Sequence, residues 1–116
     1  MNLWFVETLV FTRHIERLGL EADLRRLQQE LLENPLAGDL DPGTGGLRKV
    51  RMTAGARGKG KRSGARVHYL WLPAHGVVYL LFVYGKSDMD TLERAQKRAL
   101  KGVVEKIKAE WNRRHR

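Results

Sequence analysis

Two segments with the composition of β-strands lie close together in the second half of the chain. Arg66–Leu72 and Val77–Tyr84 are rich in β-branched and aromatic residues, and only Pro73–Gly76 separates them. A connection this short joins antiparallel strands, so the two segments predict a β-hairpin. The second segment is apolar almost throughout, which indicates a strand that is buried on both faces.

Further strands are predicted at Asn2–Val6 and Leu47–Met52, with a turn-rich connection at Leu36–Gly46. Side chains alternate between the two faces of a strand. Lys49 and Arg51 therefore share a face, and we expect Arg66 on the next strand to project to the same side of the sheet.

Three helices complete the predicted fold. The first begins after Thr8, a good capping residue, and ends at Gly19. The second carries leucines at helical spacing and stops at Asn34-Pro35. The third, near the C-terminus, has an apolar face made by Leu92, Ala99, Val103, Ile107 and Trp111. The order predicts one α+β domain over residues 1–116, with a small antiparallel sheet, two N-terminal helices and a C-terminal helix, all on one side of the sheet.

The net charge of +9 is concentrated in the middle of the chain. Residues 42–87 contain no Asp or Glu but nine Lys and Arg, whereas the remainder carries thirteen basic and thirteen acidic side chains. Cations without internal partners repel one another, so a surface of this kind indicates an anionic partner, with nucleic acid first.

Several chemistries are excluded by the residues present. The chain has no cysteine, so disulfides and thiolate metal sites are impossible. The glycine-lysine stretch "GARGKGKR" has Arg62 where a P-loop needs Ser or Thr. The acid-free segment offers only His68 and His75 as metal ligands, so we expect no metal and no cofactor. No segment has the length of a membrane span or the pattern of a signal peptide, which predicts a soluble, cytoplasmic protein.

Cationic side chains can cleave RNA without a metal ion. The 2′-hydroxyl is the nucleophile, and the protein has to remove a proton, stabilise the phosphorane and protonate the leaving oxygen. Arginine suits the second task because its fork matches phosphate oxygens. Lysine or His68 could carry the protons, although a packing role for His68 is the simpler interpretation.

Three stretches resemble the RelE/HigB group of bacterial type II toxins, and most closely its HigB-like branch. They are "GTGGLRKVR" at 43–51, "GKGKRSGARVHYLW" at 58–71 and "VYLLFVYGKSDMDTL" at 78–92. The resemblance covers nearly the whole chain. It implies a toxin that enters the ribosome and cuts mRNA, and whose partner is a cognate HigA-like helix-turn-helix antitoxin.

The resemblance also implies roles for individual residues. The paired basic residues of the family's first central strand fall on Lys49 and Arg51, the arginine that opens the next strand on Arg66, and the basic loop residues on Lys59, Lys61 and Arg62. From the residues themselves we add Lys86 to the catalytic candidates Lys49, Arg51 and Arg66. Likewise we add Arg48, Arg57, His68 and Tyr84 to the RNA-binding candidates. RelE itself has an arginine after its glycine-lysine pair and a tyrosine near the C-terminus. This chain has Ser87 and Thr91 or Leu92 there. The general acid is therefore left open between Tyr84, Lys86 and His68.

Two other functions fit the same sequence. A related branch of toxins poisons DNA gyrase without cutting RNA, but its basic strand cluster is generally poorer than this one. A basic RNA-binding or ribosome-associated module would use phosphate contacts alone, with aromatic residues such as Tyr69 and Trp71 available for stacking.

Overall fold

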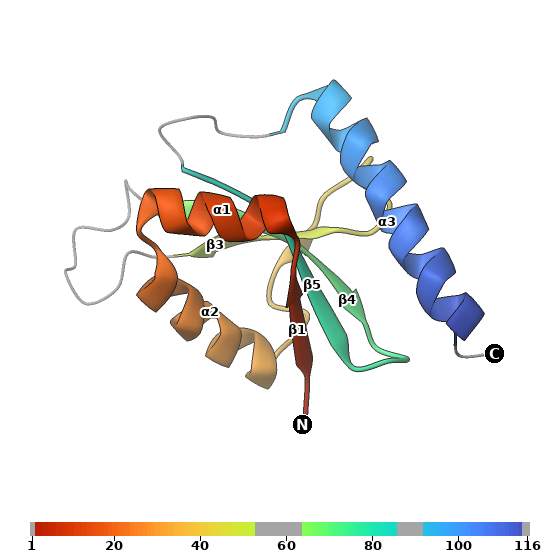
Figure 1. Cartoon of the computed structure of the whole chain (residues 1–116), viewed down its shortest axis with the longest axis horizontal. Coiled ribbons are helices and arrows are strands. Elements are labelled where there is room, and N and C mark those ends of the chain that lie inside the picture. The colour runs from red at the N-terminus through yellow and green to blue at the C-terminus, as the bar shows by residue number, and fades with distance from the viewer. Residues whose placement is uncertain (1, 53–63, 86–91, 115–116) are drawn as a thin grey trace.

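The computed structural model describes residues 2–52, 64–85 and 92–114 and has the predicted α+β organisation (Figure 1). Its elements are β1 (Trp4–Glu7), α1 (Leu9–Leu18), α2 (Glu21–Glu33), β2 (Asp39–Leu40), β3 (Arg48–Met52), β4 (Ala65–Leu72), β5 (Val77–Gly85) and α3 (Arg94–Arg114). The two N-terminal helices, the C-terminal helix and the hairpin are confirmed. The two-residue strand β2 lies within the segment predicted as a turn-rich connection.

The sheet is mixed rather than wholly antiparallel. Its five strands lie in the order β1-β5-β4-β3-β2, and the neighbours from β2 to β5 are antiparallel. β1 adds to the edge of β5 in the parallel direction, with Trp4 opposite Val77. This pairing is possible because α1 and the segments that follow it separate β1 from the rest of the sheet, giving the chain room for a crossover.

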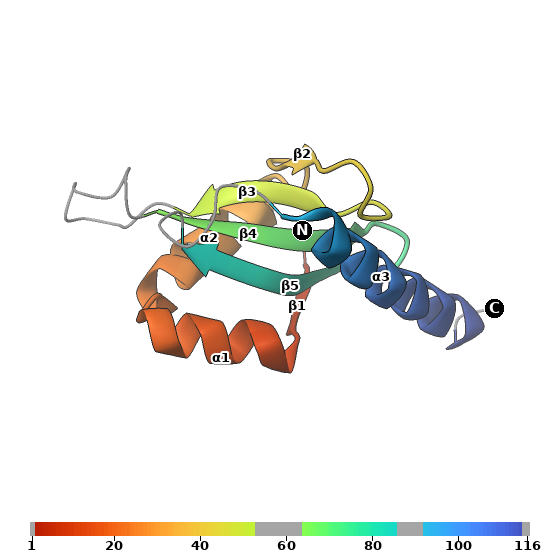
Figure 2. The same ribbon diagram turned by 90° about the horizontal axis from the view of Figure 1, so that it is seen from above.

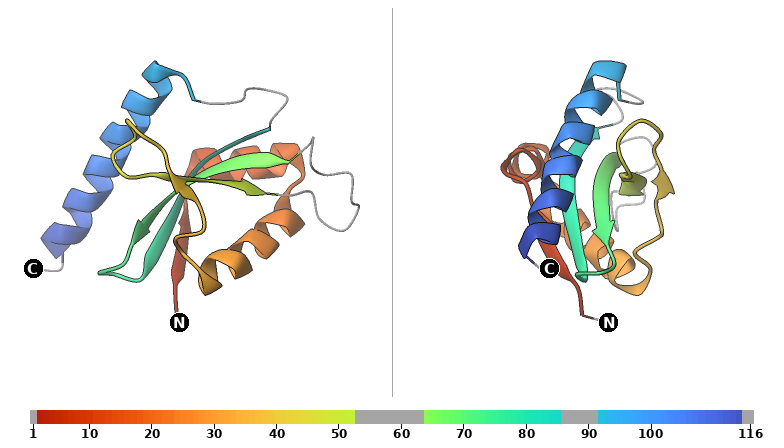
Figure 3. Two further views of the ribbon diagram at one scale, coloured as in Figure 1. Left: turned by 180° about the vertical axis from the view of Figure 1, so that it is seen from behind. Right: turned by 90° about the vertical axis from the view of Figure 1, so that its right-hand side faces the viewer.

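The helices cover both faces of the sheet, which corrects the expectation that they lie on one side (Figures 2 and 3). α1 and α2 pack on one face through a core that includes Phe11, Leu27 and Val67. α3 packs on the other face over Leu47, Leu70 and Leu72. Both faces of the central strands are therefore apolar over much of their length, as their composition requires.

A β-bulge in β5 decides which of its side chains reach the α3 face. His68 is opposite Phe82, but Tyr69 is opposite Leu80, so Leu81 is an extra residue in β5. The bulge is held by the start of α1, where the Thr8 hydroxyl donates to the Leu81 carbonyl at 2.9 Å and accepts from the Phe11 amide. Beyond the bulge, the positions of β5 whose side chains face α3 are shifted by one residue.

α3 lies on the sheet through a narrower apolar face than the sequence indicates. Val104 is fully buried, and Leu100, Ile107 and Trp111 pack beside it. Val103 was expected on this face but is 41% exposed, because it projects beside the sheet contact into an apolar groove between α1 and α3. None of the helices in the described residues is long and apolar enough to cross a membrane.

Candidate nucleic-acid interface

Arg51 and Arg66 are direct cross-strand neighbours. They pair in the antiparallel register of β3 and β4, and Lys49 pairs with His68 in the same ladder. Directly opposed residues share a face, with Cβ atoms about 4.5–5.5 Å apart. The prediction that Lys49, Arg51 and Arg66 project to one side of the sheet is therefore confirmed, and we call these three residues the basic face.

The basic face lies on the α3 side of the sheet, beyond the start of that helix. Leu47, which precedes Lys49 on the same face, is buried under α3, whereas Arg51 is exposed. β4 shows the same change along this face: Leu70 is buried under α3, whereas Arg66 is half-buried. α3 thus covers one end of this sheet face, and among the described residues no helix covers the other end, where the basic face lies (Figure 2).

The cations of the basic face are not neutralised by the described part of the protein. The ion pairs formed there involve other residues: Asp23 with Arg26, Asp41 with His68 and Lys97, and Glu110 with Arg113 and Arg114. Two arginines at opposed positions repel each other. An anionic ligand that bridges them would remove this repulsion and gain charge-assisted hydrogen bonds.

Arg48 does not belong to the basic face. It is opposite Tyr69, on the α2 side of the sheet, and its guanidinium donates to the Gly38 carbonyl at 2.6 Å. Strand alternation directs it away from Lys49 and Arg51. Its predicted contact with the same RNA segment is therefore not supported.

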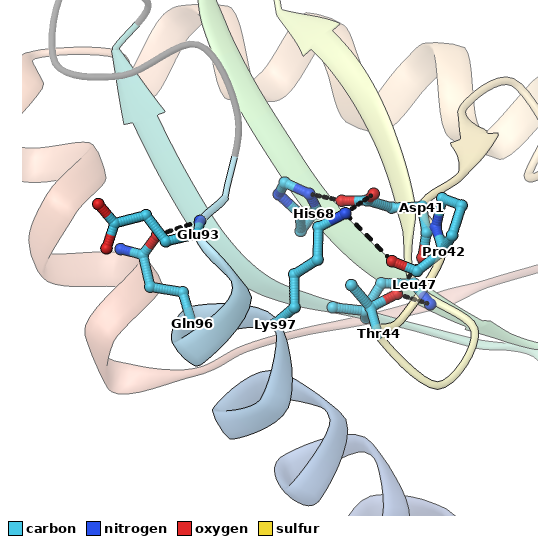
Figure 4. A network of polar contacts seen from close by, with 8 residues as sticks. All are labelled: Asp41, Pro42, Thr44, Leu47, His68, Glu93, Gln96 and Lys97. Carbon is cyan, nitrogen blue, oxygen red and sulfur yellow. Dashed lines mark hydrogen bonds and ion pairs between the residues drawn. The ribbon is translucent and has the colours of Figure 1, made fainter.

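His68 lies beneath the basic face in a buried polar network. Its side chain is fully buried, and Nε2 donates to Asp41 Oδ2 at 2.7 Å, since a carboxylate can only accept (Figure 4). Lys97 of α3 donates to Asp41 Oδ1 at 2.9 Å and to the Pro42 carbonyl. Among the described residues the other ring nitrogen, Nδ1, has no hydrogen-bond partner. The network joins the loop before β3, the centre of β4 and the start of α3.

The charges of this network follow from burial and proximity. Burial lowers the pKa of His68, and the nearby Lys49 and Lys97 lower it further, against the opposing effect of Asp41. Burial alone would raise the pKa of Asp41, but its hydrogen bonds with Lys97 and His68 outweigh that effect and lower it. We infer a neutral imidazole beside a carboxylate, a state in which Nδ1 carries a lone pair rather than a proton.

The buried aromatic and imidazole rings do not form an RNA-contact surface. Tyr84 is 3% exposed and is stacked on His68, with ring centroids 5.8 Å apart. The bulge in β5 brings Tyr84 opposite Arg66, on the basic side of the sheet, but below its surface. The predicted RNA contacts of His68 and Tyr84 are therefore not supported.

The remaining predicted site residues, Arg57, Lys59, Lys61, Arg62 and Lys86, lie outside the described residues.

Asp41 and Lys97 are the residues that the sequence prediction missed. They are 56 positions apart, and no local spacing connects them. Asp41 is the last acid before the acid-free segment, and it sits at the start of a tightly bonded loop: its amide donates to the Leu47 carbonyl, and Thr44 bonds to both ends. The one available signal was an acid followed by Pro and a run of glycines, which is typical of an ordered turn.

Compared with known protein families, the chain matches no family model. The resemblance to RelE/HigB toxins therefore stays a prediction based on the three sequence stretches.

Proposed function

We propose that this chain is a toxin of the RelE/HigB kind, which cleaves mRNA on the ribosome without a metal ion. On this proposal it acts in the cytoplasm and is neutralised by a helix-turn-helix antitoxin. The observation that carries the proposal is the direct opposition of Arg51 and Arg66 on a sheet face that none of the described helices covers, with no carboxylate among the described residues paired to either.

The basic face fits the charge that develops when RNA is cleaved. The 2′-oxygen attacks the adjacent phosphorus, the P–O5′ bond breaks, and the phosphorane between them carries extra negative charge. Arg51 and Arg66 hold two guanidinium groups on the same face, where they would bind its oxygens and stabilise this state. Both are fixed on strands, so little reorganisation is needed.

Proton transfer falls to lysines in this proposal. The neutral His68 is buried below the face and bonded to Asp41, so it serves to position Lys49 and the loop rather than to exchange protons with RNA. Lys49, opposite His68 and half-buried, is the proposed base. Lys86 is the proposed acid, because the other two candidates, His68 and Tyr84, are buried.

A second candidate is an RNA-binding module that does not cleave. The burial of both His68 and Tyr84 favours it, because two of the three residues considered for the general acid do not reach the surface. Such a protein would use the same basic face for phosphate contacts, with strong dependence on salt.

The test compares Arg66→Gln with Arg26→Gln in a purified translation system. Arg26 is an exposed arginine on α2 that pairs with Asp23, so its replacement removes the same charge away from the basic face. Cleavage of mRNA is read by primer extension, and folding by circular dichroism. We expect Arg66→Gln to lower the cleavage rate by about a hundredfold, the scale of losing one group that stabilises an anionic transition state, and Arg26→Gln to cleave normally.

The other outcomes are equally distinct. Wild-type protein that binds RNA without cutting it supports the second candidate. Protein that neither cuts nor binds RNA contradicts both, and a gyrase supercoiling assay then examines the gyrase-poisoning alternative.

A further inference from the structure

An open cleft lies between the loop before β3 and the first turns of α3. It has a volume of about 620 Å³. Its lining consists of Pro42, Gly43, Leu92, Arg94, Lys97 and Arg98. The cleft is therefore basic, and it is large enough for a phosphate group with part of its sugar.

The basic residues of the cleft are in an unfavourable position within the protein itself. Arg94, Lys97 and Arg98 are three and four residues apart, so they lie on the same face of the helix, where like charges repel. They also occupy the first turns of α3, where the helix dipole favours anions, and the first turn contains no acid. The protein thus places cations at a site whose backbone attracts negative charge.

Neighbouring carboxylates neutralise only one of these cations. Lys97 is paired with Asp41. Arg94 and Arg98 are exposed, and neither forms an ion pair with a described residue. Glu93 is adjacent in sequence, but its amide is bonded to Gln96 and its carboxylate points away from Lys97 (Figure 4). No carboxylate of the described residues therefore occupies the two guanidinium groups at the cleft.

The cleft is connected to the basic face through the buried polar network. Lys97 of the cleft donates to Asp41, and Asp41 also accepts from His68. His68 is opposite Lys49 of the basic face in the ladder of β3 and β4. The two cationic surfaces are thus joined by a short chain of bonded residues, and a flexible polynucleotide backbone could reach from one to the other.

We propose that this cleft binds a second backbone phosphate of the RNA strand whose scissile phosphate lies on the basic face. The inference rests on the proposed function, because it assigns a further subsite to the same substrate. A phosphate in the cleft would accept from Arg94 and Arg98, relieve their repulsion and meet the positive end of the α3 dipole. The protein would then hold single-stranded RNA at two points and present the bond at the basic face.

The experiment compares Arg98→Gln with Lys106→Gln. Both residues are exposed cations of α3, but Lys106 is not among the cleft residues. Binding is measured by fluorescence anisotropy over a range of salt, using 2′-O-methyl RNA, which cannot be cleaved. Two probes are used: a dinucleotide that spans a single phosphate and a longer single strand that can occupy both sites.

We expect Arg98→Gln to weaken binding of the longer strand about twofold to fivefold and to reduce the slope of log K against log salt by about 0.7, the value for one lost phosphate contact on a single strand. Binding of the dinucleotide should be unchanged, and Lys106→Gln should resemble the wild type with both probes.

Three results would overturn the proposal, and they can be told apart. If Arg98→Gln and Lys106→Gln bind the longer strand equally well while cleavage still depends on Arg66, the cleft is not an RNA subsite and the proposed function stands. Binding of inorganic phosphate at micromolar concentration that depends on Arg98, together with binding of the longer strand that is the same in the wild type and in Arg98→Gln, identifies the cleft as a site for a free anion. Wild-type protein without RNA binding contradicts the cleft and the proposed function together.

Discussion

His68 donates a 2.7 Å hydrogen bond to Asp41 underneath the basic face, and the same carboxylate accepts from Lys97 on α3. Asp41 is thus the common partner of a strand residue and a helix residue. Its own side chain is only 5% exposed. This carboxylate therefore ties the start of α3 to the centre of β4, in addition to the apolar contacts of the helix with the sheet.

Replacing Asp41 with alanine should destabilise the protein strongly. The variant removes the acceptor of a buried imidazole N–H and one of the two acceptors of the partly buried Lys97 ammonium group, which costs about 2–4 kcal/mol in the free energy of unfolding. The measurement is urea denaturation at neutral pH. Glu110→Gln is the control, because Glu110 forms exposed ion pairs with Arg113 and Arg114, and its loss should cost less than about 1 kcal/mol. Equal effects of the two variants would show that Asp41 does not hold α3 in place.

The stability of the protein should fall on mild acidification because of His68. Its pKa is lowered in the folded protein, so below the ordinary value of 6.5 the unfolded chain binds a proton that the folded chain does not. Stability is therefore complete above that pH and is lost as the pH falls below it, with a slope of at most about 1.4 kcal/mol per pH unit. The lowered pKa of Asp41 acts in the same direction, at still lower pH.

The measurement is the free energy of unfolding from pH 7.5 to 5, compared between wild type, His68→Gln and His75→Gln. Glutamine at position 68 keeps a donor for Asp41 but cannot titrate, so this variant should show a shallower slope. His75, which is half-buried against Trp111, is the control. A His68→Gln curve parallel to the wild-type curve would refute the assignment of a neutral, buried imidazole.

Features set by neighbouring residues could be predicted from the sequence. Thr8 caps α1 through its hydroxyl, and Gly19 ends the helix in the left-handed conformation, which its lack of a Cβ allows; both are as predicted. The grouping of Lys49, Arg51 and Arg66 also followed from alternation along two strands. In each case the physical cause acts within a few residues, or across one hairpin.

Features set by contacts between distant segments could not be predicted. The extra residue Leu81 in β5 depends on hydrogen bonds from Thr8, which is 73 positions away, and it decides that Tyr84 shares a side with Arg66. The pairing of Asp41 with Lys97 depends likewise on α3 crossing the second face of the sheet. The apolar composition of the central strands indicated that both of their faces are buried, but it did not indicate which helix packs on each face.

Neutralising either arginine of the basic face should stabilise the protein while impairing its activity. Arg51 and Arg66 are opposed like charges, and relieving their repulsion is worth about 0.2–1 kcal/mol. We therefore expect Arg51→Gln and Arg66→Gln each to raise the free energy of unfolding, more at low salt than at high salt. The double variant should gain little beyond one single variant, because the repulsion is already absent.

The measurement is urea denaturation at two ionic strengths. Arg26→Gln, which loses its ion pair with Asp23, should show no gain. A loss of stability in both basic-face variants would mean that the arginines have partners within the protein, which would remove the main support for an anionic ligand.

Cleavage of RNA should continue after divalent ions are chelated by EDTA. The described residues contain no group of three or more histidine or acidic side chains that could hold a metal ion, and residues 42–87 contain no carboxylate at all. A two-metal nuclease needs such carboxylates to hold its ions, whereas the basic face supplies positive charge directly through Arg51 and Arg66.

Because ribosomes themselves need magnesium, EDTA is added only up to the concentration at which the same ribosomes still form peptide bonds. We expect an unchanged cleavage rate over that range. A rate that falls with EDTA and recovers on adding one particular divalent ion would instead place a metal at the scissile phosphate and reduce Arg51 and Arg66 to binding residues.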